Sequence, residues 1–206
     1  MEIWDISPLI STRTAVFPGD VPFSQKISMS FPNGDHLKLS SINTTPHIGA
    51  HVDAPSHYHP RGLDIDQVSL EPYIGNAQVI EVKLGENSHI EPQHFSSHQI
   101  KARRILFKTN SFEIHESWDE TFNAISPETI KYLKQKDVIL IGIDTPSVDK
   151  SDSKDLLGHQ EFYKNNIRVL EGITLSEVPE GVYELIALPL KLEGLDASPV
   201  RAILRR

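Results

Sequence analysis

Residues 45–59 read Thr45-Pro-His-Ile-Gly-Ala-His-Val-Asp-Ala-Pro-Ser-His-Tyr-His59, and they hold four of the ten histidines of the chain. Gly49 and Pro55 disfavour a sustained helix here, so we interpret the stretch as extended. Polar and apolar residues then alternate between the two faces of a strand. One face carries His47, Gly49, His51 and Asp53, and the other carries Ile48, Ala50, Val52 and Ala54. The pattern predicts a strand that packs its apolar face in a core and presents imidazole and carboxylate groups to a metal ion.

The distance along such a strand limits what one ion can bind. At about 3.3 Å per residue, a flat strand would separate the Cα atoms of His47 and Asp53 by roughly 20 Å, whereas zinc ligands lie about 2.0–2.2 Å from the ion. We therefore expect the chain to bend at Gly49 or to serve two ions. A histidine-rich surface loop without metal is the alternative interpretation, and His59, beside Pro60, is expected to be exposed.

The rest of the chain predicts more strand than helix. Strands are expected at 77–82, 104–109, 138–143, 167–170 and 183–192, with others near Ile27 and at 37–42. Ser126-Pro127-Glu128 predicts the start of a helix that ends near Lys136. A second helix is expected from about Ser153 to Tyr163. Because no linker or repeat divides the sequence, we expect one domain, residues 1–206, of mixed α/β class.

Composition excludes several classes of function. The chain has 206 residues and no cysteine, which excludes disulfides, cysteine zinc sites and thiolate nucleophiles. Its 20 basic and 28 acidic residues give a formal net charge of −8, which argues against nucleic acid and anionic membranes as partners. No run of 18 apolar residues occurs, and the N-terminus lacks a basic stretch followed by an apolar one. We therefore expect a cytoplasmic protein.

Two residues outside the histidine-rich stretch are candidate ligands. Glu171 has the same strand parity as Ile167, Val169 and Ile173, so its carboxylate would lie on an apolar face. An unpaired carboxylate is costly there, and coordination of a metal ion would offset the cost. The alternative is that the strand ends and turns outward at Gly172. His159 lies on the second expected helix, where a lone histidine is more often a packing residue than a ligand. The residue types suit Zn²⁺ or Mn²⁺ equally.

The segment His47-Ile-Gly-Ala-His51-Val-Asp53-Ala-Pro-Ser-His57 resembles the H-x-G-x-H-x-D-x-P-x-H signature of the metal-dependent cyclase-like hydrolases. The similarity extends along nearly the whole chain, at 5–8, 17–20, 141–147 and 170–172. The C-terminal segments 185–190 and 196–202 match the kynurenine formamidase branch of that family. The resemblance implies a swivelling β/β/α fold, rich in strands with few helices, that is usually a homodimer.

The resemblance also implies roles for individual residues. It implies two zinc ions per subunit, with Mn²⁺ as an alternative, held by His47, His51, Asp53, His159 and Glu171. Asp53 and Glu171 would each reach both ions. His57 would be the general acid and base, and Phe17 would contact the substrate. Without the resemblance, Phe17 beside a Pro-Gly turn is an ordinary core aromatic.

The reaction implied is hydrolysis of N-formyl-L-kynurenine to L-kynurenine and formate, a step of tryptophan degradation. A cyclic-amide hydrolase of the isatin-opening type is the first rival, because it would use the same metal ligands. A non-enzymatic metal-binding protein on the same fold is the second rival. A serine esterase is disfavoured because no Gly-x-Ser-x-Gly segment occurs.

Overall fold

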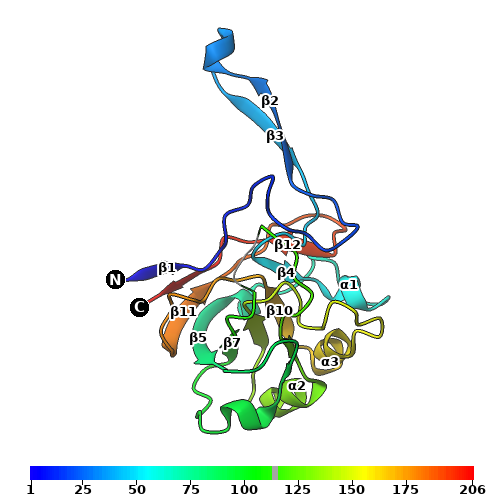
Figure 1. The fold of residues 1–206 in the computed structure, drawn as a ribbon, viewed down its shortest axis with the longest axis vertical. Coiled ribbons are helices and arrows are strands. Elements are labelled where there is room, and N and C mark those ends of the chain that lie inside the picture. Colours follow the sequence, from blue (N-terminus) through cyan, green and yellow to red (C-terminus); the bar gives the residue numbers. More distant parts are fainter. Residues whose placement is uncertain (113–115) are drawn as a thin grey trace.

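Nine strands form one curled sheet in the computed structural model, which describes residues 1–112 and 116–206 (Figure 1). In sheet order these strands are β1 (Ile3–Asp5), β13 (Ile203–Arg205), β11 (Gly181–Ile186), β5 (Ile74–Glu81), β7 (Arg104–Lys108), β9 (Leu140–Ile143), β10 (Arg168–Glu171), β4 (His51–Asp53) and β12 (Ala197–Pro199). Strands β5, β7, β9 and β10 are parallel, and the other neighbours in the sheet pair antiparallel. The expectation of a strand-rich α/β fold is confirmed.

Helices cover one side of this sheet. They are α1 (Pro55–Tyr58), α2 (Pro127–Lys134) and α3 (Leu157–Asn165), and short 3₁₀ turns lie at Phe31–Asn33, Glu71–Tyr73 and Pro92–Phe95. Helix α2 begins as the sequence predicts, since the Ser126 side chain accepts a hydrogen bond from the amide of Thr129. A small parallel pair, β6 (His89–Ile90) and β8 (Ala124–Ile125), lies apart from the main sheet. No helix in the described part of the chain is both long enough and apolar enough to cross a membrane.

The main sheet separates two apolar cores. Along β7, Leu106 belongs to one core, whereas Ile105 and Phe107 belong to the other, as the two-residue period of a strand requires. The second core also holds Ile130 of α2 and Phe162 of α3, so it fills the space between the sheet and the helices. Side chains on the helix side of β10 and β4 therefore approach α3.

A hairpin of two strands projects from the body as an arm (Figure 1). It consists of β2 (Ser24–Met29) and β3 (Leu39–Asn43), joined through the turn that contains the 3₁₀ segment, and it pairs antiparallel with an irregularity between Ile27 and Met29. Residues of both strands are exposed almost throughout. We call residues 24–43 the arm.

Two expected elements have different limits in the structure. The strand expected at 183–192 ends at Ile186, before Pro189, which has no amide hydrogen to donate to a ladder. The helix expected from Ser153 begins only at Leu157, because Leu156 adopts a left-handed conformation with φ 46°. It ends at Asn165, two residues beyond the expected Tyr163, where Asn166 adopts a left-handed conformation and closes the helix.

Candidate metal centre

The sheet register brings two ligand-bearing strands together. Strand β4 pairs with β10 so that His51 lies opposite Glu171 and Asp53 opposite Val169. Because Val169 faces the helix-side core, these side chains share that side of the sheet. Glu171, Asp53 and His51 are all nearly fully buried. The expectation that Glu171 faces an apolar layer is confirmed, and its outward alternative is wrong.

The chain bends before β4, as the spacing of His47 and Asp53 requires. Gly49 adopts φ +57°, and only residues 51–53 form a strand, so the extended interpretation of residues 47–50 is wrong. Gly172, directly after Glu171, adopts φ +64°, and a Cβ there would lie 2.2 Å from the carbonyl oxygen of Gly49. The two glycines therefore allow the bend before β4 to contact the chain directly after β10. The turn at Gly172 also moves Ile173 into the opposite core.

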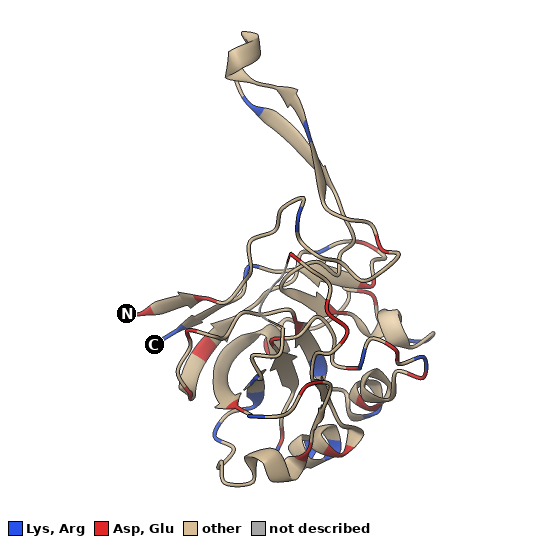
Figure 2. Cartoon of the chain, viewed as in Figure 1, with Lys and Arg blue, Asp and Glu red and all other residues tan. Residues whose placement is uncertain are grey.

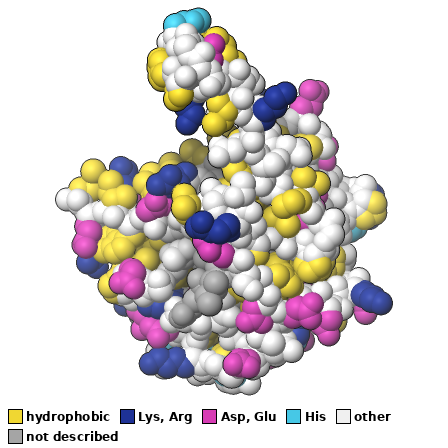
Figure 3. Space-filling view, turned by 45° about the horizontal axis from the view of Figure 1, so that its top comes forward, with side chains coloured by type: hydrophobic (Ala, Val, Ile, Leu, Met, Phe, Trp, Pro, Cys, Tyr) yellow, Lys and Arg dark blue, Asp and Glu magenta, His cyan; other side chains and the backbone are white. Residues whose placement is uncertain are grey.

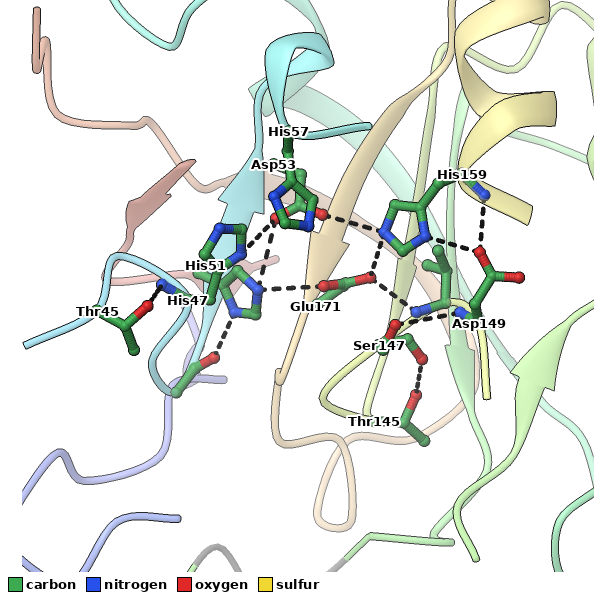
Figure 4. A network of polar contacts seen from close by, with 12 residues as sticks. Thr45, His47, His51, Asp53, His57, Thr145, Ser147, Asp149, His159 and Glu171 are labelled. Atoms are coloured by element: carbon green, nitrogen blue, oxygen red, sulfur yellow. Dashed lines mark hydrogen bonds and ion pairs between the residues drawn. The ribbon is translucent and has the colours of Figure 1, made fainter. Parts of the chain in front are cut away.

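Three imidazoles each bind an outside acceptor through one nitrogen, and Figure 4 shows two of these contacts, those of His51 and His159. Nδ1 of His51 lies 2.9 Å from the carbonyl oxygen of Gly49, and Nδ1 of His159 lies 2.7 Å from Oδ2 of Asp149. Nε2 of His47 lies 3.1 Å from Oδ2 of Asp196. A carbonyl or carboxylate oxygen only accepts, so each of these nitrogens is the N–H donor. In the neutral rings, the other nitrogen then carries a lone pair.

Those lone pairs point at two carboxylates. Nδ1 of His47 lies 3.1 Å from Oδ1 of Asp53, and Nε2 of His159 lies 3.3 Å from Oδ2 of the same residue. Nε2 of His51 lies 3.1 Å from Oε2 of Glu171. Oδ1 of Asp53 is buried and accepts no hydrogen bond. Two hydrogen-bond acceptors repel each other at these distances, and a cation between them removes the repulsion. The side chains therefore fit a metal ion.

The electrostatics of the cluster agree with that fit. Burial lowers the pKa of His159, but hydrogen bonds to Asp149 and Asp53 outweigh it and raise the pKa to about 10. Burial likewise lowers the pKa of His47, and the neighbouring carboxylates of Asp196 and Asp53 raise it to about 10. Burial raises the pKa of Asp53, whereas the His159 and His47 rings beside it bring it well below its ordinary value. The carboxylates thus favour positive charge among them, which a divalent ion supplies without protons.

His57 lies beside the cluster, on the four-residue helix α1. Its ring lies 4.2 Å from that of His47 and 5.8 Å from that of His159, between ring centroids. Nδ1 of His57 lies 3.2 Å from Oδ2 of Asp196. The side chain is 32% exposed, more than those of the buried His51 and His159. It can therefore reach a molecule that enters from solvent.

A cavity of about 260 Å³ opens onto these rings. His47, His51, His57, His159 and Glu171 line one side of it. Phe17 and Trp118 line another side and form an edge-to-face pair with ring centroids 5.2 Å apart. Phe17 is 47% exposed, so it is not the ordinary core aromatic of the alternative interpretation. Imidazoles and carboxylates thus face an aromatic wall across one cavity.

Comparisons with known proteins place the chain in a family. The family model described as "Putative cyclase" matches residues 4–150. A protein from Polaromonas naphthalenivorans is 46% identical over 207 aligned positions, covering 100% of this chain and 91% of the relative. The chain belongs to the cyclase family. Its relative in Polaromonas is named kynurenine formamidase, as is one from Bordetella pertussis that is 44% identical, with 98% of this chain and 97% of the relative covered.

A solved structure extends the likeness to the whole cyclase fold. It is titled as a potential metal-dependent hydrolase with cyclase activity and matches this chain with a TM-score of 0.83 and 26% identity. The match covers 98% of this chain and 96% of the other. The fold of this cyclase-family chain is therefore shared over nearly its full length.

The sequence did not predict three residues that lie at or beside the candidate site, namely Asp149, Asp196 and Trp118. Asp149 binds the amides of Gly158 and His159 as well as the His159 ring, and an acid ten residues before a helical histidine carries no periodic signal. Asp196 lies in the segment 196–202 that carries the family resemblance, but nothing local ties it to residues 139 positions away. Trp118 has no partner motif in the sequence. Each was found only through the fold.

Proposed function

We propose that this chain is a metal-dependent amidohydrolase that converts N-formyl-L-kynurenine to L-kynurenine and formate. The observation that carries the proposal is the convergence of three imidazole lone pairs on two buried carboxylates beside an aromatic-walled cavity. The full-length relatives named kynurenine formamidase support the choice of substrate. The reaction belongs to tryptophan degradation.

We propose His47, His51, Asp53, His159 and Glu171 as the ligands of two zinc ions, with Mn²⁺ as the alternative. The two oxygens of Asp53 support a bridging role, because Oδ1 faces His47 and Oδ2 faces His159. Glu171 is placed similarly, with Oε2 towards His51 and Oε1 3.6 Å from Nε2 of His159. When bound, zinc polarises a carbonyl oxygen and lowers the pKa of a water molecule to about 7.

The protein side chains supply the rest of the chemistry. Phe17 and Trp118 offer edges and faces for the aniline ring of the substrate, which orients the formyl group towards the histidines. The leaving group is an aromatic amine, so a proton must reach its nitrogen as the C–N bond breaks. His57 is the half-exposed imidazole at the cavity, and we assign the proton transfer to its Nε2, since Nδ1 is bound to Asp196.

The first experiment measures kynurenine formation from N-formyl-L-kynurenine by absorbance. Turnover should disappear after treatment with a chelator and return with added Zn²⁺ or Mn²⁺, and isatin serves as the competing substrate. Absence of formamidase activity in protein with full metal content, together with opening of isatin, would contradict the proposed substrate. Turnover that persists after rigorous metal removal would contradict the metal mechanism.

Replacement of His57 separates catalysis from metal binding. His57→Ala should lower kcat by about 10² to 10⁴, the usual contribution of a positioned acid or base, while metal content by mass spectrometry stays at the wild-type level. His59→Ala is the matched control, because His59 stacks on Tyr163 and does not line the cavity. Loss of metal from His57→Ala would show that His57 is a ligand instead.

We also propose that the enzyme is a homodimer. The arm supports this proposal, because it carries exposed apolar side chains away from the body, among them Ile27, Phe31 and Ile42. The single-domain organisation of residues 1–206 and the cytoplasmic location stay predictions of the sequence.

A further inference from the structure

One carboxylate oxygen contacts two rings of the site. Oδ2 of Asp196 lies 3.1 Å from Nε2 of His47 and 3.2 Å from Nδ1 of His57. Both nitrogens donate to it, because a carboxylate oxygen only accepts. Asp196 therefore joins the proposed acid and base to a proposed metal ligand.

The backbone holds Asp196 in this place. It directly precedes β12, whose Ala197 pairs with Asp53 of β4. Its own carbonyl oxygen accepts a hydrogen bond from the amide of Ala54 at 2.9 Å, and the carbonyl oxygen of Leu195 accepts one from Ile65 at 2.8 Å. The carboxylate is thus fixed from both sides against the turn that leads from β4 into α1, the helix that carries His57.

The direction of the His57 ring follows from this contact. A neutral imidazole carries its proton on either nitrogen, and a hydrogen bond from one of them selects the tautomer. With Nδ1–H bound to Asp196, the free lone pair of His57 is on Nε2. A ring nitrogen of His57 lies within 4.8 Å of a carboxylate oxygen of Asp53 and a ring nitrogen of His159, so the ring faces the cluster.

We propose that Asp196 is a positioning residue that fixes the tautomer and direction of the His57 ring, an inference that rests on the proposed function for its kinetic consequence. Asp196 does not itself line the cavity, but it contacts two residues that do, His47 and His57. When the metal sites are saturated, its effect on turnover passes through His57. The same geometry makes a prediction about the ring itself, which holds whatever the substrate is.

The kinetic test uses zinc-loaded Asp196→Ala. At saturating zinc we expect kcat for N-formyl-L-kynurenine to fall about ten- to a hundredfold, less than the loss expected for His57→Ala, with KM unchanged. In a His57→Ala background the same substitution should have no further effect. Asp196→Asn, which keeps the shape and one acceptor oxygen, should retain more activity than Asp196→Ala. Glu193→Ala, an exposed acid three residues earlier, is the matched control.

The outcomes separate the inference from its rivals. The trio His47, His57 and Asp196 could itself hold a metal ion, so loss of zinc from both Asp196 variants would make Asp196 a ligand and overturn the inference. Independent, multiplying effects of the two substitutions would overturn it as well, and so would wild-type kcat in Asp196→Ala.

A spectroscopic readout tests the inference even if the enzyme has another substrate. In ¹⁵N-labelled zinc-loaded protein, long-range ¹H–¹⁵N correlation should show His57, assigned by its absence in His57→Ala, with its proton on Nδ1. Asp196→Ala should move that proton to Nε2 or give a mixture, while Glu193→Ala leaves it on Nδ1. An Nδ1–H tautomer that survives the loss of Asp196 would refute the positioning role.

Discussion

In the candidate metal centre, His47, His51 and His159 each donate one ring N–H to an acceptor outside the cluster, and this hydrogen bond orients the other ring nitrogen. For His51 the acceptor is the carbonyl oxygen of Gly49, two residues away, so the bend at Gly49 both shortens the segment and orients a ligand. For His159 the acceptor is a side chain, Asp149. A side-chain acceptor can be replaced by mutation, whereas a backbone acceptor cannot.

Asp149→Asn tests this orientation. We expect metal affinity to fall about 10- to 100-fold, because an amide cannot accept from the His159 ring as strongly as a carboxylate and also serve the amides of Gly158 and His159. Competition with a chromogenic chelator measures the change. Asp152→Asn, at an exposed acid in the same loop, is the control. Unchanged affinity would mean that the His159 ring is held by its helix alone.

Phe17→Ala tests the aromatic wall. Loss of one aromatic partner is worth about 0.5–1.5 kcal/mol beyond its buried area, so KM for N-formyl-L-kynurenine should rise about two- to tenfold or more, with a smaller change in kcat. Phe31→Ala, on the arm and outside the cavity lining, should leave KM unchanged. Equal KM values for the two variants would remove Phe17 from the substrate contacts.

The sequence predicts the residues of the cluster itself better than Asp149 and Asp196, which hold its imidazole rings by hydrogen bonds. Alternation in residues 47–54 correctly indicates which apolar side chains are buried, since Ile48, Ala50, Val52 and Ala54 are all buried. The same pattern fails at His47, because a positive φ at Gly49 ends the extended geometry. Asp149 and Asp196 depend on contacts between distant segments, which no local period encodes. Their positions follow from the sheet register and from the start of α3.

At the scale of elements, the candidate ligands come together because β4, β10 and α3 meet on one side of the sheet. The expected strand at 167–170 ends directly before Glu171 and the expected second helix contains His159, so the general location of both residues is predictable. The late start of α3 is not, because Leu156 adopts a left-handed conformation that its side chain does not favour. The neighbouring strand order, in which β4 lies between β10 and β12, is also set by long-range pairing.

Gly172→Ala tests the close approach of these elements. Gly194 has a similar φ of +71° with nothing near its missing Cβ, so Gly194→Ala measures backbone strain alone, about 1–2 kcal/mol. In Gly172→Ala the Cβ would also meet the carbonyl oxygen of Gly49, which adds about 1–3 kcal/mol of overpacking and displaces Glu171 from His51. Urea unfolding and metal content measure both effects. Equal losses of unfolding free energy in the two variants would show that Gly172 and Gly49 are not in close contact.

At the scale of the molecule, the arm differs from the body in charge and in packing. It carries Lys26, Lys38 and a single acid, Asp35, whereas the whole chain has a net charge of −8 (Figure 2). Hydrophobic side chains are visible on its surface as well (Figure 3). A two-stranded hairpin alone is marginally stable in water, so an exposed one gains from a partner surface. In the homodimer that we propose, a second acidic copy of this chain would provide that surface through a two-fold interface.

The register of the arm allows a sharp test of this dimer. Gln25 pairs with Ile42 and Ile27 with Ser40, so Ile27 and Ile42 share one face, while Ser41 lies on the other. Ile27→Ser combined with Ile42→Ser should convert a dimer into a monomer in analytical ultracentrifugation and leave the far-ultraviolet circular dichroism unchanged, because neither residue packs in a core. Ser41→Ala should stay dimeric. A wild-type monomer, or a double variant that still dimerises, would remove the arm from the subunit interface.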